Sequence, residues 1–410
     1  MAAVETSTGA REARRPEWLE NIGGQLLALL TALGIAVLLG AVIIVAYGED
    51  PITVYRAILN GSFGDKNGFG YVLANAGPLI FSALAVSVCF KGGMFNIGVE
   101  GQFIVGMATA SFAALTFTFL PAPLLVLTVL LFGMLGGMVW AAVPAILKVK
   151  TGAHEVVTTI MMNGVAASLV AWVIQGPLRY EDTGGGFNVN LRTDPFPDAA
   201  MIPDLGHLFG IRSSVRLSWV LPLALVAAAV MWFVLRRMRL GYEARAVGVS
   251  PGSAQAGGIS IGAVQIKLFL LSGALAGLVG IQQLFADQGF LPAGYEAGIG
   301  FTGIAVAFLG QNSPVGIVFA ALLWGVLARG ETSLQLETDV PREFIIILQG
   351  LLILSVVVTY QLAKRRLFAR QLRRAAAVED LRDSEASEQV EPAEGPTDGP
   401  KDGPTGEVTH

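Results

Sequence analysis

Long apolar runs alternate with short polar breaks along most of this chain. The runs occupy residues 24–47, 69–90, 102–120, 124–147, 156–175, 217–235, 268–286, 299–309, 315–327 and 344–360. A helix needs about 20 mostly apolar residues to cross the hydrocarbon core of a bilayer. Because most of these runs approach that length, the pattern predicts an all-α polytopic membrane protein with about ten transmembrane helices.

One break, from Lys91 to Gln102, has the wrong composition for a regular helix in lipid. Four glycines, Asn96, Glu100 and Gln102 fall within residues 92–102, and each glycine weakens a helix by roughly 1 kcal/mol relative to alanine. Irregular backbone at membrane depth is tolerated only inside protein or beside water, and transporters build sites at such points. The pattern favours a broken or re-entrant segment that lines a route or sets the local structure. The alternative is an interfacial turn with Glu100 in water.

The positive charges indicate an orientation. With both termini in the cytoplasm, seventeen Lys and Arg residues flank the cytoplasmic ends of the expected helices and eight flank the external ends. Cytoplasmic loops of membrane proteins carry such an excess, so we expect an even number of crossings. The charges leave open whether 299–309 crosses fully, because the turn that follows it, residues 311–313, is uncharged.

The domain organisation follows from the same pattern. We expect a cytoplasmic N-terminal segment at 1–20 and a transmembrane domain at 21–363, with an external loop at 176–216 and a cytoplasmic loop at 236–267. Residues 48–68 read as a further polar loop. Residues 375–410 carry ten Asp or Glu against two Lys or Arg. Low hydrophobicity with high charge predicts a disordered acidic tail.

The cytoplasmic loop at 236–267 contains signals for two short helices. Residues 242–249 can form two turns, Ser250 and Pro251 suit a new helix start, and Gly257 with Gly258 suits its end. Two short helices across the cytoplasmic face would fit the groove of a partner, with Arg245 offering a charge to a partner carboxylate. The alternative is an ordinary connecting loop.

Composition excludes several classes of protein. The chain is 53% hydrophobic and 14% charged, with a mean hydropathy of +0.63, which is too apolar for a soluble protein. The single cysteine, Cys89, is expected to pack, and the three histidines lack metal-ligand spacing. Without HExxH, CxxC or a Gly-Lys pair, we expect no catalytic residue, metal or cofactor. An intramembrane enzyme is disfavoured, and any ATP would be hydrolysed by another subunit.

Several stretches resemble a known family. They are Phe95-Asn96-Ile97-Gly98-Val99-Glu100-Gly101-Gln102, Arg245-Ala246-Val247-Gly248 with Pro251 and Gly257-Gly258-Ile259, the run 303–310, the run 314–316, and the run 154–163. Together they resemble ATP-binding-cassette permeases of the ribose and branched-chain amino acid superfamily, in particular the nucleoside-importing, simple-sugar branch. The likeness runs from about residue 25 to residue 365. His154 and Gln311 depart from the residues usual in that family.

The resemblance implies a membrane subunit of an ATP-driven nucleoside importer in the bacterial cell membrane. Its implied partners are an ATP-binding-cassette ATPase, a second and shorter permease, an extracytoplasmic solute-binding lipoprotein and membrane lipid, with no nucleic acid. A heterodimer of permeases is favoured over a homodimer. The alternatives are a permease for sugars such as ribose or for branched-chain amino acids, and an ATP-independent secondary carrier.

Three groups of residues carry the expected function. A nucleoside has a base that can stack and a hydroxylated ribose, so its path should offer amides and aromatic faces. The candidates are Asn75, Phe95, Asn96, Gln102 and Asn163, although helix–helix hydrogen bonding is the commoner role of such amides. Gly98, Glu100 and Gly101 form the structural motif, with Glu100 expected to pin the broken segment by accepting hydrogen bonds from free amides. The ATPase-coupling candidates are Tyr242, Glu243, Arg245, Ala246, Gly248, Pro251 and Gly257.

Overall fold

The computed structural model describes residues 17–180, 191–211, 216–295, 297–337, 343–356 and 358–359. The chain divides into two units, Met1–Val357 and Val358–His410. Every element discussed below belongs to the first unit. Residues 1–16 of the expected N-terminal segment and the whole acidic tail lie outside the described residues.

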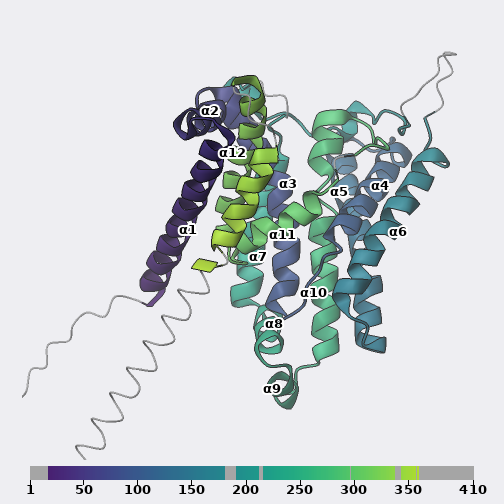
Figure 1. Cartoon of the computed structure of the whole chain (residues 1–410). Helices are drawn as coiled ribbons and strands as arrows, with labels where there is room; N and C mark the ends of the chain where they lie inside the picture. Colours follow the sequence, from purple (N-terminus) through teal and green to yellow (C-terminus); the bar gives the residue numbers. More distant parts are fainter. Residues whose placement is uncertain are drawn as a thin grey trace, which may run out of the picture. The chain divides into compact units, whose positions relative to one another are not determined.

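The described part of the chain is helical and contains no strand beyond two isolated bridges (Figure 1). Its labelled helices are α1 (Glu17–Tyr47), α2 (Pro51–Phe63), α3 (Lys66–Lys91), α4 (Val99–Thr116), α5 (Ala122–Thr151), α6 (Glu155–Gln175), α7 (Val220–Arg237), α8 (Arg239–Val249), α9 (Pro251–Ala256), α10 (Ile261–Ala276), α11 (Ile299–Leu309) and α12 (Pro314–Glu337), with the short helices η1 (Asp198–Ala200), η2 (Gly206–Phe209) and η3 (Gln283–Gln288). A further helix covers Glu343–Val356. The all-α prediction is confirmed for these residues.

Several helices have the length and composition to cross a membrane. Among the described residues, α3, α5, α6, α7 and α12 do so singly, and α1 with α2 forms a further candidate pair bent by 119°. Helix α11 has eleven residues, or about 16 Å of length, against a hydrocarbon core of about 30 Å. A multi-pass membrane protein is therefore supported, and α11 alone is too short to cross.

Several expected boundaries are wrong, including the end of the run 315–327, which continues as α12 to Glu337. Residues 48–68 were predicted as a loop, but they hold α2, whose first turn is capped because the Asp50 carboxylate accepts hydrogen bonds from the amides of Ile52 and Thr53. Asp50 followed by Pro51 is a helix-start signal that outweighs the glycines nearby. The run predicted at 268–286 begins earlier, as α10 at Ile261, and its end lies in η3, a short π-helix.

Helix α3 lies at the centre of the bundle. Eighteen of its 26 residues are buried, and it packs against α2, α7, α10, α11 and α12 (Figure 1). A helix that is apolar on every side can be enclosed in this way. A displacement of α3 would therefore disturb its packing against all five of these helices.

Glycines let α4, α5 and α10 approach closely. A Cβ added to Gly106 of α4 would lie 2.6 Å from the Cα of Gly277, the C-cap of α10, and one added to Gly277 would overlap the carbonyl oxygen of Gly133 on α5. Gly137 faces Gly273 in the same manner. The pairs 133/137 and 273/277 repeat at four residues, the small-residue spacing that joins helices in membranes.

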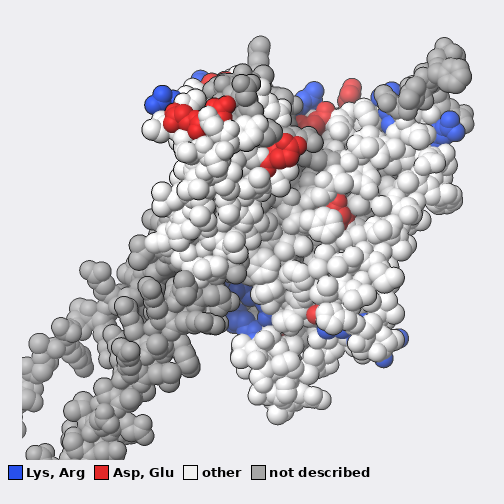
Figure 2. All heavy atoms as spheres, viewed as in Figure 1, with Lys and Arg blue, Asp and Glu red and all other residues white. Residues whose placement is uncertain are grey.

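The surface of the bundle is apolar over its middle. Figure 2 shows that Lys, Arg, Asp and Glu on this face gather mainly toward its two ends, with white surface between. The outward sides of α5, α6 and α7 present large apolar side chains, including Leu131, Val165 and Val226. This arrangement suits helices that face lipid.

The long loop between α6 and α7, described at residues 176–180, 191–211 and 216–219, is tied to the segment 283–293. The amides of Thr193, Phe196 and Ile202 donate to the carbonyls of Leu291 (3.0 Å), Gly289 (2.7 Å) and Phe285 (2.7 Å). The rings of Phe196 and Phe285 stack at 4.6 Å. The loop therefore follows the segment after α10 for most of its described length.

Candidate functional site

The segment between α3 and α4 is broken, as its composition predicts. Helix α3 ends at Lys91, α4 begins at Val99, and Gly93 lies in the left-handed region with φ +71°. The side chain of Glu100, in the first turn of α4, is only 5% exposed. The alternative of a turn that leaves Glu100 in water therefore does not describe this structure.

The carboxylate of Glu100 binds the start of α11. Its Oε1 accepts a hydrogen bond from the amide of Gly298 at 2.7 Å, and its Oε2 accepts one from the amide of Gly300 at 2.8 Å. The first amides of a helix lack partners within the helix and favour a negative charge. Gly300 must be small here, because an added Cβ would lie 2.5 Å from the Glu100 amide nitrogen.

Asn163 of α6 holds the broken segment from another side. Its Oδ1 accepts a hydrogen bond from the amide of Gly101 at 2.9 Å, and its Nδ2 donates one to the carbonyl of Ile97 at 3.0 Å. Both backbone groups lie at the break, where the regular helical partners are missing. Asn163 thus supplies a hydrogen-bond donor and an acceptor to backbone groups that have no partner within the broken segment.

Asn96 and Gln102 form a closed polar network with Ser272 of α10. The Asn96 Nδ2 donates to Gln102 Oε1 at 3.0 Å and to Ser272 Oγ at 2.9 Å, and the Asn96 Oδ1 accepts from the amide of Gly98 at 2.9 Å. Ser272 in turn donates to the carbonyl of Ala85 on α3 at 2.6 Å. Asn96 and Gln102 are 0% and 1% exposed, so these amides bind each other in this conformation.

The remaining route candidates do not join this network. Phe95 is half-buried and its ring contacts Phe90 and Phe308. Asn75 donates to the carbonyl of Tyr71 within α3 and precedes Lys91 by sixteen residues, or about 24 Å along the helix. Solute contact by these five residues stays a prediction.

The expected pair of short helices in the loop 236–267 is present. Helix α8 covers Arg239–Val249, Ser250 caps α9 through the Ser253 amide, Pro251 is the first residue of α9, and Gly257 follows its end. Arg239 pairs with Glu243 at 2.6 Å. The guanidinium of Arg245 donates to the carbonyl of Leu235 at the end of α7, so α8 is fastened to the helix before it.

One side of this pair of helices is exposed. Tyr242 is 63% exposed and Val249 is 87% exposed, and Gly248 and Pro251 are also exposed. Ala246 is half-buried. Two short helices with small residues and an exposed aromatic ring offer a surface of the kind that enters a groove of a partner.

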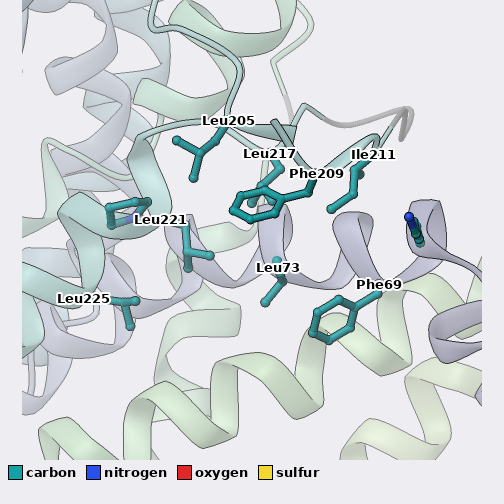
Figure 3. Close-up of a pocket in the computed structure, with 10 residues that line it drawn as sticks. Phe69, Leu73, Leu205, Phe209, Ile211, Leu217, Leu221 and Leu225 are labelled. Carbon is teal, nitrogen blue, oxygen red and sulfur yellow. The ribbon is translucent and has the colours of Figure 1, made fainter. Parts of the chain in front are cut away.

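An apolar groove of about 520 Å³ lies elsewhere, beside the first half of α3 (Figure 3). Leucines from α3, α7 and the long loop line it, with Phe69 and Phe209 at its sides and Lys66 as its charged residue. A site for a hydroxylated solute needs several placed polar groups. This groove lacks them and is not the candidate route.

Sequence reasoning missed two polar residues of the site. Ser272 completes the network around Asn96, and Ser82 donates to the carbonyl of Ile299 at 3.1 Å, where α3 crosses the start of α11. Single serines inside apolar helices are a weak signal, because a hydroxyl there can also bond within its own helix. Ser272 and Ser82 are recognised as part of the site only by their hydrogen-bond partners, which lie far away in the sequence.

Comparison with known proteins identifies relatives over most of this chain. Residues 68–357 match the family model described as branched-chain amino acid transport system / permease component. The guanosine ABC transporter permease NupP of Bacillus subtilis is 35% identical, covering 82% of this chain and 94% of NupP. The nucleoside ABC transporter permease NupB of Lactococcus lactis is 32% identical (83% and 93%). The glucose ABC transporter permease TsgB13 of Haloferax volcanii is 34% identical (83% and 88%).

The same two bacteria each carry a second, more distant relative. These are the guanosine permease NupQ of Bacillus subtilis, 28% identical over 67% of this chain, and the nucleoside permease NupC of Lactococcus lactis, 29% identical over 61%. Each organism thus has two different permeases that resemble this one.

Proposed function

Since this chain belongs to the family of permease components of branched-chain amino acid transport systems, we propose that it is the membrane subunit of an ATP-driven importer for nucleosides. The observation that carries the proposal is the pair of relatives named for guanosine and nucleoside transport, each matched over more than nine tenths of its length. The chain works as a transport subunit and leaves ATP hydrolysis to a separate ATPase.

The proposed assembly contains four kinds of subunit. An ATP-binding-cassette ATPase drives the cycle, an extracytoplasmic lipoprotein delivers the solute, and a second, shorter permease completes the route. The occurrence of NupP with NupQ, and of NupB with NupC, supports a heterodimer of permeases. The complex resides in a bacterial plasma membrane, with lipid around the permeases.

The proposed topology has about ten crossings and both termini in the cytoplasm. The excess of Lys and Arg at the α8 end of the helices supports this orientation. The α8–α9 pair then lies in the cytoplasm, where Tyr242, Arg245, Gly248 and Pro251 meet the ATPase. ATP favours one arrangement of the permeases and the loaded lipoprotein acts on the same equilibrium, so that the route opens to alternate sides.

The proposed roles of the broken segment divide into two kinds. Gly98, Glu100 and Gly101 maintain its fold, which the hydrogen bonds of Glu100 and Asn163 support. Asn75, Phe95, Asn96, Gln102 and Asn163 remain candidates for solute contact, and the two half-buried amides, Asn75 and Asn163, are the more accessible in this conformation.

A transport assay in proteoliposomes tests the function. The complete complex should accumulate radiolabelled guanosine, adenosine or uridine only with ATP inside the compartment that holds the ATPase. The permease alone should accumulate none, and accumulation by the permease alone would instead support a secondary carrier.

A sugar importer is the second candidate, because TsgB13, a glucose permease, is as similar as the nucleoside permeases. Competition separates the two. Unlabelled glucose or leucine in excess should leave nucleoside uptake unchanged, whereas uptake of labelled glucose by the complex, with none of nucleosides, would reject the proposed solute.

A further inference from the structure

Three phenylalanine rings meet where α3, the broken segment and α11 converge. Phe90 and Phe308 have ring centroids 5.2 Å apart, Phe90 and Phe95 are 6.0 Å apart, and Phe95 and Phe308 are 6.1 Å apart. Phe90 remains 40% exposed and the other two rings are half-buried. We call these three residues the ring cluster. It lies beside Lys91, the residue at which α3 ends.

Helix α8 touches the backbone between two of these rings. A Cβ added to Gly93 would lie 3.2 Å from the Cα of Gly248, and one added to Gly248 would lie 3.1 Å from the amide nitrogen of Gly93 and would overlap the carbonyl oxygen of Lys91. The two backbones therefore meet with no side chain between them. A displacement of α8 toward this contact must displace residues 91–93, which link Phe90 to Phe95.

The third ring stands on an element that is held elsewhere. Phe308 lies near the end of α11, and the start of α11 is fixed by the two hydrogen bonds from the Glu100 carboxylate. Ser82 of α3 also bonds the start of α11. Phe90 and Phe95 thus neighbour the residues that α8 touches, whereas Phe308 belongs to a short helix anchored at its opposite end.

We infer that the ring cluster closes the solute route at the α8 end of this permease, and that the contact between Gly93 and Gly248 is where α8 opens it. The inference rests on the proposed importer function and adds the gate and its point of contact. A constriction of apolar rings excludes water and hydroxylated solutes. An aromatic pair adds only modest stabilisation beyond its buried area, so the rings can separate and return in every cycle.

Crosslinking across the cluster tests the gate. In the complete complex on a Cys89→Ser background, the double variant Phe90→Cys/Phe308→Cys should be linked without nucleotide by a short bis-methanethiosulfonate reagent, which bonds each thiol in a mixed disulfide and releases methanesulfinate. The bonded complex should lose ATP-dependent nucleoside uptake until a reductant restores it. The control pair is Phe63→Cys/Phe69→Cys, whose rings are 6.1 Å apart on α2 and α3. Its crosslink with the same reagent should leave uptake unchanged.

The result that overturns the gate is uptake at the uncrosslinked rate with the Phe90–Phe308 pair fully bonded. Uptake by the Cys89→Ser parent reports on the proposed function, and the ratio of bonded to reduced uptake reports on the gate. Each can therefore fail by itself. Truncation gives an independent readout, because Phe308→Ala should raise ATP-independent leakage of nucleoside from loaded liposomes, and leakage at the parent level would contradict the gate.

Two alanine substitutions in the same loop test the contact with α8. Gly248→Ala adds a methyl group that overlaps Lys91, whereas Gly252→Ala, in α9, meets nothing within 4 Å. We expect nucleoside uptake per ATP hydrolysed to fall roughly tenfold in Gly248→Ala, a typical size for coupling between sites. Gly252→Ala should keep both. Equal uptake per ATP in the two variants would overturn the role of this contact.

Discussion

The carboxylate of Glu100 accepts a hydrogen bond from the amide of Gly298, 198 residues further along the chain, at a distance of 2.7 Å. One charged side chain in the first turn of α4 thereby completes the first turn of α11.

Removal of the Glu100 carboxylate should destabilise the permease. Glu100→Ala leaves the amides of the half-buried Gly298 and the buried Gly300 without their acceptor. An unpaired group that water cannot reach costs about 1–3 kcal/mol. Glu100→Gln keeps one acceptor oxygen and should lose less. We measure the unfolding temperature in detergent by fluorescence-detected size exclusion, and we expect it to fall from wild type to Glu100→Gln and further to Glu100→Ala. An Ala variant as stable as wild type would show that α11 does not depend on this bond.

Asn163→Ala should weaken the same region from the α6 side. The substitution leaves the amide of Gly101 and the carbonyl of Ile97 unpaired, with a cost of about 1–3 kcal/mol for each group that water cannot reach. The matched control is Ser168→Ala on the same helix, where the hydroxyl is exposed and bonds only to the carbonyl of Gly164. We expect a lower unfolding temperature and lower uptake for Asn163→Ala alone. Equal behaviour of the two variants would remove Asn163 from the site.

Arg245→Glu should separate ATP hydrolysis from uptake. The guanidinium of Arg245 bonds the carbonyl of Leu235, and a carboxylate there would repel that oxygen and loosen α8 from α7. Binding of solute to the lipoprotein should be unaffected, while nucleoside uptake per ATP falls roughly tenfold. Lys150→Glu, an exposed charge reversal at the end of α5, is the control. Coupled uptake at the wild-type ratio in Arg245→Glu would reject the docking assignment of α8.

Gly277→Ala should lower the stability of the bundle. The added methyl group overlaps the carbonyl oxygen of Gly133, and overpacking of this kind costs about 1–3 kcal/mol. Gly164→Ala on α6 meets nothing within 4 Å and should be neutral or slightly stabilising, since alanine favours a helix over glycine by roughly 1 kcal/mol. Folded yield and unfolding temperature measure both. A Gly277→Ala variant as stable as Gly164→Ala would contradict the close helix contact.

Local signals in the sequence predicted the local features of this fold. Glycines and polar residues marked the break before Val99, and Ser250, Pro251 and Gly257 marked the boundaries of α9, because caps and turns depend on residues next to them. The same logic failed at α2, where glycines suggested a loop although Asp50 and Pro51 begin a helix. Apolar runs also hid the true ends of α10, because lipid-facing and protein-facing residues are equally apolar.

Contacts between distant residues could not be predicted in this way. Sequence alone suggested that Glu100 binds free amides, but it could not identify them as those of Gly298 and Gly300. Asn96 and Gln102 were grouped with Asn163 as route residues because all three carry amides. Asn96, which bonds Gln102, also reaches Ser272, whereas Asn163 bonds the broken backbone. These partners depend on how α6 and α10 pack against α4, which no spacing within the chain encodes.

The backbone hydrogen bonds between the long loop and the segment 283–293 have a practical consequence for protein engineering. A chimera that takes residues 191–211 from a relative would bring in backbone amides and carbonyls positioned to bond that relative's own segment after α10, and they would not match residues 283–293 of this chain. Because these hydrogen bonds need groups from both stretches, a loop swap should transplant both together and leave α7 and α10 in place.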